Sequence, residues 1–184
     1  MKILGVTGVC GSGKTTVIKM LAKELGWYPI YVGQILRDKF EGDKEALTEN
    51  GELAPESWMR SQVVSEVQKA YELGCEGVII DGMPRIPSQV SFLKELSDDV
   101  QVVIIKANLK TVISRLSNRG REDDTDNMIK ARVRKWESGV IDISLELLGE
   151  EIPFAIYQSK DLPNMSEIII SKIIKFVDSN NKID

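Results

Sequence analysis

The chain has 184 residues and a net charge of −4, with two cysteines and no histidine. The lack of histidine excludes Ser-His and Cys-His nucleophile pairs and histidine-ligated metals, and two cysteines cannot form a four-cysteine zinc site. The acidic total argues against nucleic-acid binding as the main role. Since no run approaches 18 apolar residues, we expect a single-domain cytoplasmic monomer over residues 1–184, with no membrane segment, zinc or nucleic-acid partner.

The first predicted elements are a buried strand over residues 2–7 and a helix over 14–25, joined by a glycine-rich turn. Residues 8–15 read Gly-Val-Cys-Gly-Ser-Gly-Lys-Thr, which is the spacing of a phosphate-binding P-loop. Glycines let backbone N–H groups approach a phosphate closely, and the positive end of the helix reinforces that site. Lys14 would reach the β- and γ-phosphates of a nucleotide, and Thr15 would offer its hydroxyl to hydrated Mg²⁺. The predicted nucleotide ligands here are Gly11, Ser12, Gly13, Lys14, Thr15 and Thr16.

Apolar runs then alternate with helical patterns to the end of the chain. The further strands are predicted over 28–32, 78–81, 100–106 and 152–157, and the further helices over 33–40, 55–73, 89–96, 109–117, 126–147 and 166–178. The helix over 55–73 would bury Met59, Val63, Val67, Ala70 and Tyr71. This alternation predicts an α/β fold of the P-loop NTPase type, in which helices cover both faces of a parallel five-stranded sheet.

A second motif follows the predicted strand over 78–81. Asp81 ends that strand, and in such sheets ligands bind beyond the carboxyl ends of the strands, so its carboxylate could hold Mg²⁺ through water. Arg85 can grip phosphate with its guanidinium fork. Gln89 can pair with a nucleobase edge, because an amide both donates and accepts hydrogen bonds. The alternative for this segment is a strand-to-helix loop with a solvated arginine.

Five arginines lie within twenty residues of this acidic chain: Arg115, Arg119, Arg121, Arg132 and Arg134. They could form a solvated basic face. A nucleic-acid patch would call for interleaved aromatic residues, and only Trp136 is near. The third interpretation is charge stabilisation of a phosphoryl group during transfer, for which arginine is well suited.

The chain resembles the nucleoside monophosphate kinase family, and its adenylate kinase branch most of all. The family's D-G-[FY]-P-R-x-x-x-Q motif matches residues 81–89, and its G-D-L-L-R segment loosely matches 33–37. Its G-x-L-V-P motif is matched by 51–55. Its lid motif R-x-D-D, with K-x-R-[LV] on the following helix, is matched by 121–124 and 130–133. Four matches in the same order cover nearly the whole chain.

The resemblance implies reversible transfer of the γ-phosphoryl group of ATP, bound with Mg²⁺, to a nucleoside monophosphate, chiefly AMP (ATP + AMP = 2 ADP). A small flap of about residues 33–60 would bind the acceptor, and a short lid of about 118–126 would close over the site. The implied acceptor-binding residues are Gly33, Arg37, Leu53, Gly82, Arg85 and Gln89. The implied catalytic residues are Lys14, Arg85, Arg119, Arg121 and Arg132. Arg115 and Arg119 would also contact the donor nucleotide, with Arg115 along its adenine.

The chain departs from the family's usual sequence at two positions, and other phosphoryl acceptors than AMP therefore remain as alternatives. The P-loop has Lys14-Thr15-Thr16 where the family usually has Lys-Gly-Thr, and Val32 stands where Ser or Thr usually precedes the glycine. That second position helps to select the acceptor base, so a kinase for CMP, UMP or a deoxynucleotide is the first alternative. More distant alternatives are a kinase of a small metabolite such as shikimate or gluconate, and a regulatory NTPase.

Overall fold

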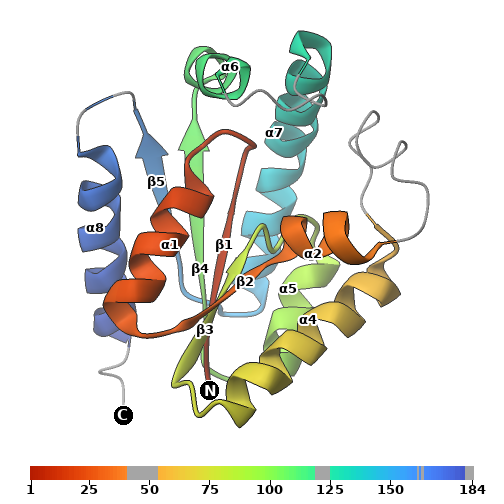
Figure 1. Ribbon diagram of the computed structural model, residues 1–184, viewed down its shortest axis with the longest axis vertical. Helices are drawn as coiled ribbons and strands as arrows, with labels where there is room; N and C mark the ends of the chain where they lie inside the picture. The colour runs from red at the N-terminus through yellow and green to blue at the C-terminus, as the bar shows by residue number, and fades with distance from the viewer. Residues whose placement is uncertain (41–53, 119–124, 161, 163, 181–184) are drawn as a thin grey trace.

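The structure is a computed structural model that describes residues 1–40, 54–118, 125–160, 162 and 164–180 (Figure 1). Its strands are β1 (Lys2–Gly8), β2 (Tyr28–Tyr31), β3 (Gly77–Asp81), β4 (Val100–Ala107) and β5 (Phe154–Ser159). Its helices are α1 (Lys14–Leu25), α2 (Val32–Lys39), α4 (Glu56–Glu72), α5 (Ser88–Leu96), α6 (Leu109–Ser117), α7 (Asp126–Gly149) and α8 (Met165–Asn180).

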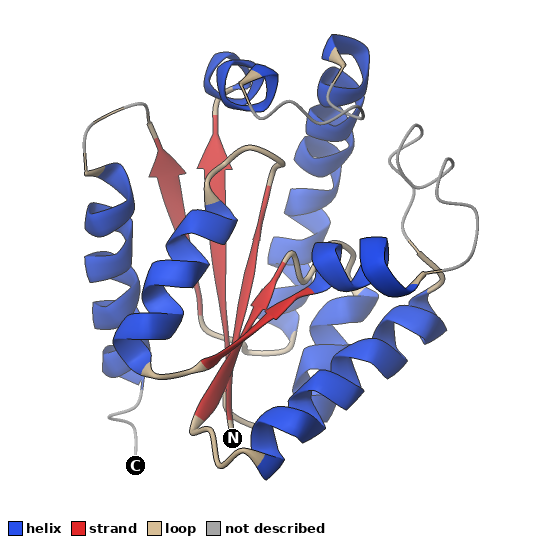
Figure 2. Ribbon diagram, in the orientation of Figure 1, coloured by secondary structure: helices blue, strands red, loops and turns tan. Residues whose placement is uncertain are grey.

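The five strands form one parallel sheet in the order β2-β3-β1-β4-β5. Helices α1 and α8 cover one face, whereas α4, α5 and α7 cover the other (Figures 1 and 2). The central strands need this double cover because their apolar residues point to both faces. In β4, for example, Val102, Val103, Ile104 and Ile105 are all fully buried. The predicted three-layer α/β fold is therefore confirmed.

The alternation of side chains along β1 shows how the two cores are separated. Leu4 packs with residues of α1 and α8 on one face, and Ile3 packs with residues of α5 and α7 on the other. Burying a large aliphatic side chain contributes about 1.5–3 kcal/mol. No helix among the described residues has the length and apolar composition needed to cross a membrane.

Two sequence predictions differ from the structure. The last strand begins at Phe154 rather than at residue 152, because the N–H of Ile152 donates to the Leu147 carbonyl at 2.9 Å and so closes the end of α7. Tyr71 was predicted to be buried, but 69% of its surface is exposed. Its neighbour Ala70 occupies the buried position, and each helical residue is rotated by about 100° from the one before.

The carboxyl ends of β1 and β3 bring the two sequence motifs together. β1 leads directly into the P-loop, and the register places Val6 beside Asp81. One residue later, the N–H of Gly82 donates to the Val6 carbonyl at 2.8 Å. The turn after β3 is therefore held against the base of the P-loop.

Candidate active site

The P-loop adopts backbone angles that its glycines permit. Gly8 has a φ of 147°, and a Cβ atom there would lie 2.1 Å from the Ile105 carbonyl oxygen. Gly13, with a φ of 93°, immediately precedes α1 in the left-handed region. Lys14 is largely buried, and its Nζ donates to the carbonyls of Gly8 at 2.8 Å and Val9 at 2.9 Å. The ammonium group is thus held over the concave side of the loop, where a phosphate would compete for it.

Thr15 and Asp81, which were predicted to face Mg²⁺, lie in direct contact. The hydroxyl of Thr15 donates to Oδ2 of Asp81 at 2.7 Å, although the two residues are 66 positions apart. Hydroxyl and carboxylate oxygens are the hard ligands that Mg²⁺ prefers. No group of three His, Cys, Asp or Glu side chains that could hold a metal occurs in the described part of the chain. The pair therefore fits an ion that keeps most of its water and phosphate ligands, as Mg²⁺ does.

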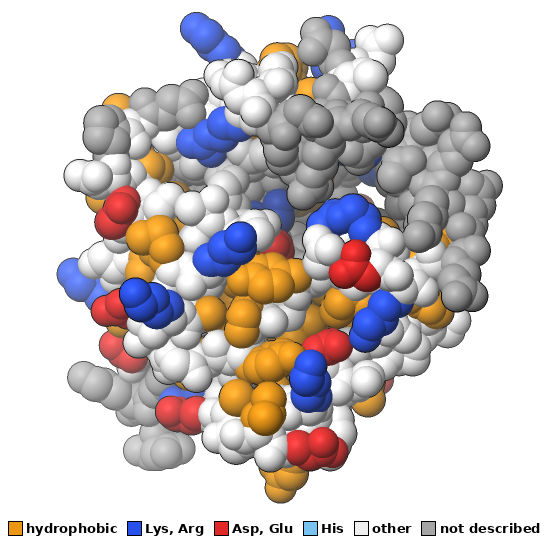
Figure 3. All heavy atoms as spheres, in the orientation of Figure 1, with side chains coloured by type: hydrophobic (Ala, Val, Ile, Leu, Met, Phe, Trp, Pro, Cys, Tyr) orange, Lys and Arg blue, Asp and Glu red, His pale blue; other side chains and the backbone are white. Residues whose placement is uncertain are grey.

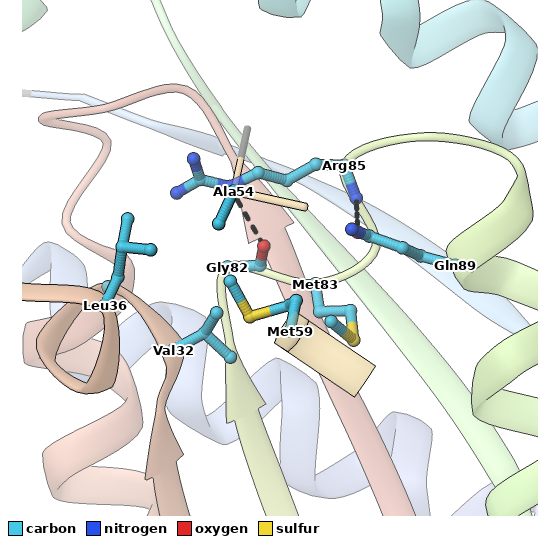
Figure 4. Close-up of a pocket in the computed structure, with 9 residues that line it drawn as sticks. Val32, Leu36, Ala54, Met59, Gly82, Met83, Arg85 and Gln89 are labelled. Atoms are coloured by element: carbon cyan, nitrogen blue, oxygen red, sulfur yellow. Dashed lines mark hydrogen bonds between the residues drawn. The ribbon is translucent and has the colours of Figure 1, made fainter. Parts of the chain in front are cut away.

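A pocket whose empty space of about 420 Å³ includes open solvent lies at the turn that follows Asp81, where Gly82 lines it (Figure 4). The pocket is lined by Val32, Gly33, Leu36, Ala54, Met59, Gly82, Met83, Arg85 and Gln89. It brings together four predicted acceptor residues: Gly33, Gly82, Arg85 and Gln89. Leu36, Met59 and Met83 were not predicted as lining residues, because apolar residues near the ends of elements look like ordinary core in a sequence.

Gln89 is nearly buried, and one end of its amide is fixed by the backbone. Its Oε1 accepts a hydrogen bond from the backbone N–H of Arg85 at 2.7 Å. Because that N–H can only donate, the amide oxygen must be the atom that faces it. The Nε2 donor is consequently the end of the amide directed away from the Arg85 N–H.

Arg85 lines the pocket, where neighbouring atoms surround its side chain without closing it off from solvent. Its Nε donates to the Gly82 carbonyl at 3.0 Å, and its side chain keeps contact with solvent. Desolvation lowers the pKa of Arg85; the negative charge of Asp81 and the nearby Cys10 oppose that shift, and the positive charge of Arg132 adds to it. The guanidinium remains charged because the ordinary pKa of arginine is so high. Arg132 is thus close enough for its positive charge to act on Arg85.

The surface view agrees with this description of the crevice. The face drawn in Figure 3 is hollowed beside α2, and side chains of Lys and Arg stand around the hollow. Positive side chains at a recess on an otherwise acidic protein favour anionic ligands.

Arg115 spans the P-loop from α6. Its guanidinium donates to the Gly11 carbonyl at 3.3 Å, the Ser159 hydroxyl at 3.0 Å and the Lys160 carbonyl at 3.1 Å. Its Nη1 lies only 3.6 Å from the position that a Cβ atom would take at Gly13. The side chain is thereby fixed beside the loop on the β5 side. Ser159, which holds it, was not predicted, because nothing near it in the sequence marks it as functional.

Arg37 belongs to a small polar network on α2. Its Nη2 donates to Oε1 of Gln34 at 2.7 Å, and Nε2 of Gln34 donates to the Asp38 carboxylate at 2.8 and 2.9 Å. The Nη1 atom of Arg37 lies 3.5 Å from the position of a Cβ at Gly33, which lines the pocket. Gln34 therefore orients the predicted phosphate-binding arginine at the rim of the pocket.

Several predicted residues lie outside the described part of the chain. These are Leu53, Arg119 and Arg121, together with residues 41–53 of the predicted flap and 119–124 of the predicted lid. The roles assigned to them remain predictions.

Comparisons with known proteins agree with the nucleotide-binding features. The family model described as an AAA domain matches residues 7–130. Adenylate kinase 1 of Nostoc sp. is 33% identical over 142 residues, which cover 71% of this chain and 76% of that protein. Adenylate kinase of Borrelia recurrentis is 32% identical over 118 residues, 61% of this chain and 54% of that protein, so the match spans about half of that relative.

A solved structure resembles the whole fold. The unliganded crystal structure of a sugar kinase from Janibacter sp. HTCC2649 aligns with 97% of this chain and 95% of its own, with a TM-score of 0.70. The sequences are only 18% identical, so this likeness concerns the fold alone.

Proposed function

Because the chain belongs to the nucleoside monophosphate kinase family, with adenylate kinases among its relatives, and is a P-loop phosphotransferase, we propose that it transfers the γ-phosphoryl group of ATP to AMP. The observation that carries this proposal is the position of Gly82. Its N–H is bonded to β1 at the base of the P-loop, its carbonyl accepts from Arg85, and it lines the pocket. A phosphoryl-donor nucleotide on the P-loop and an acceptor nucleotide in the pocket would thus lie on either side of one short turn.

The donor nucleotide would occupy the P-loop side of the crevice. Phosphates entering the loop would take over Lys14 from the carbonyls of Gly8 and Val9. Thr15 and Asp81 would hold the magnesium ion that accompanies ATP, the latter through water, and this ion supplies charge neutralisation on the phosphate oxygens. Arg115, fixed between the P-loop and the end of β5, would lie along the adenine.

The composition of the pocket supports a purine monophosphate, and adenine in particular. Val32, Leu36, Met59 and Met83 provide apolar walls for a flat ring. The Nε2 donor of Gln89 suits N1 of adenine, which accepts a hydrogen bond, whereas N1 of guanine carries a hydrogen and donates. No Asp or Glu is among the described residues that line the pocket.

The acceptor phosphate would be gripped by Arg37 and Arg85, whose planar forks match phosphate oxygens. Arg132 would neutralise charge on the transferring group together with Arg119 and Arg121. We also propose that the molecule is one kinase domain, in which α2 and the start of α4 belong to the acceptor flap and residues 118–126 to the lid.

A panel of acceptors with ATP and Mg²⁺ tests the proposal directly. The panel comprises AMP, CMP, GMP, UMP, dTMP and the deoxy form of AMP, and AMP should give the highest kcat/KM. The absence of a hydroxyl at Val32 makes CMP and UMP the acceptors to compare most carefully. A higher kcat/KM with CMP or dTMP would leave the kinase family in place and refute AMP as the preferred acceptor.

A further inference from the structure

Ser159 is a buried polar residue at the carboxyl end of the edge strand β5. Its exposed fraction is 3%. Because side chains alternate along a strand, Ser159 lies on the same face as Tyr157, which packs against the core shared with α1 and α8. The P-loop leads into α1 on that face, and the carboxyl end of β5 lies at the same edge of the sheet as the P-loop (Figure 1). In parallel sheets this is the edge where ligands bind.

The hydroxyl of Ser159 meets α6 and the P-loop at this edge. Its Oγ accepts a hydrogen bond from Nη1 of Arg115 at 3.0 Å. A Cβ atom at Gly13 would lie 3.6 Å from Nη1 of Arg115 and 4.0 Å from Oγ of Ser159. The guanidinium and the hydroxyl therefore lie together beside the glycine that immediately precedes α1.

Arg115 also donates to two backbone carbonyls, but the contact with Ser159 differs from both. Nη1 reaches the Gly11 carbonyl at 3.3 Å, and Nη2 reaches the Lys160 carbonyl at 3.1 Å. Of these three acceptors, Oγ of Ser159 is the nearest, and it is the one that a side chain supplies. The hydrogen bond to Ser159 is partly buried, whereas the one to Lys160 is exposed. Since a hydrogen bond is stronger where water is partly excluded, Ser159 contributes most to the orientation of Nη1.

We infer that Ser159 is a positioning residue of the donor site, whose buried hydroxyl holds the Arg115 guanidinium where it can lie along the base of the donor nucleotide. The inference rests on the proposed function in one respect, since it takes Arg115 to contact the donor base. A long side chain loses rotamer freedom when a ligand fixes it, and a partner that fixes it beforehand removes part of that cost. Ser159 should accordingly strengthen binding of the base and leave binding of the phosphates unchanged.

Isothermal titration calorimetry of the full-length chain with Mg²⁺ and either ATP or inorganic tripolyphosphate tests this division. Tripolyphosphate offers phosphates to the P-loop but has no base. Ser159→Ala should raise the Kd for ATP by about three- to tenfold, as expected for the loss of one hydrogen bond, and change the Kd for tripolyphosphate by less than about twofold. Ser144→Ala is the matched control, because Ser144 is a half-buried serine whose hydroxyl donates to the Val140 carbonyl within α7. Both variants should keep the wild-type circular dichroism spectrum.

A double-mutant cycle tests whether Ser159 acts through Arg115. Arg115→Ala should weaken ATP binding, and adding Ser159→Ala to it should cause no further loss, because the contributions of two residues in direct contact are not additive. The inference would be overturned by wild-type ATP binding in Ser159→Ala, by equal losses for ATP and tripolyphosphate, or by additive losses in the double variant. These measurements involve no acceptor nucleotide. Their failure is therefore distinct from a failure of the acceptor panel, which tests the proposed function.

Discussion

Lys14 is the residue on which the donor side of the site depends most. Its ammonium already lies over the loop on two backbone carbonyls. Preorganised charge of this kind is worth about 10²–10³ in kcat. Lys14→Met should therefore lower kcat by at least that factor in a steady-state assay with ATP and AMP.

The fold of this variant must be shown to survive, because Lys14 is mostly buried. Circular dichroism and thermal unfolding supply that control. A folded Lys14→Met enzyme that retains substantial turnover would contradict the P-loop assignment.

Gln89 has two separable roles at the acceptor pocket. Its oxygen holds the backbone N–H of Arg85, and its Nε2 is available to a base. Gln89→Ala removes both, and the loss of a base-edge contact worth about 1–3 kcal/mol should raise the KM for AMP while changing the KM for ATP little. Gln89→Glu keeps an acceptor for the Arg85 N–H but cannot donate when ionised, so it should also raise the KM for AMP.

The comparison between the two variants identifies which role matters. A Gln89→Glu enzyme with the wild-type KM for AMP would show that Gln89 only supports Arg85 and does not read the base. Equal increases in both KM values would instead indicate a general loss of structure.

At the level of elements, polar and cation–π contacts join α4 to α5 beside the pocket. Ser88 donates to Glu56 at 3.0 Å, Arg60 bonds Glu95, and the Arg60 guanidinium lies 4.4 Å from the centre of the Phe92 ring. The hydrogen bond to Glu95 is the main cause of a raised pKa at Arg60. These contacts join the two helices that carry pocket walls, because Met59 is on α4 and Gln89 is on α5.

We predict that Arg60→Ala raises the KM for AMP several-fold and leaves the KM for ATP unchanged, because the acceptor walls lose their spacing while the P-loop is untouched. Initial-rate kinetics with each nucleotide varied in turn measure this split. Lys69→Ala is the matched control on the same helix, since Lys69 contacts Tyr28 and Glu66 away from the pocket. Parallel changes in both KM values would refute a role specific to the acceptor.

At the scale of the whole molecule, the predicted catalytic side chains come from separate parts of the chain. Lys14 comes from the start of α1, Arg85 from the turn before α5, and Arg132 from α7. An arginine placed against a transferring phosphoryl group can be worth about 10³–10⁵ in rate. Arg132→Ala should therefore lower kcat by about a thousand-fold with only a small change in nucleotide binding, because its partner charge develops mainly in the transition state.

Thermal unfolding with a dinucleoside polyphosphate that bridges both sites separates binding from catalysis for this variant. The ligand should raise the Tm of Arg132→Ala nearly as much as that of the wild type. A variant with weakened ligand binding and an intact kcat would show that Arg132 belongs to a binding surface and not to the transferring group.

The sequence by itself determined the features that depend on neighbouring residues. The P-loop could be recognised because its glycines, lysine and threonine act within one turn and the start of one helix. The layered fold followed from continuous apolar strands alternating with helices, since each pattern reflects a local periodicity. Bounds of most elements were predicted to within one or two residues for the same reason.

Only the tertiary structure decided which distant residues meet. The contact of Thr15 with Asp81 and that of Arg115 with Ser159 depend on strand register and helix placement, which no local pattern encodes. The same holds for α7, whose apolar residues occupy both of its sides. Ile143 and Leu145 are both large aliphatic residues in the sequence, yet Ile143 is buried and Leu145 is exposed. The difference arises because burial is set by the sheet against which the helix packs, and that surface is assembled from strands far apart in the chain.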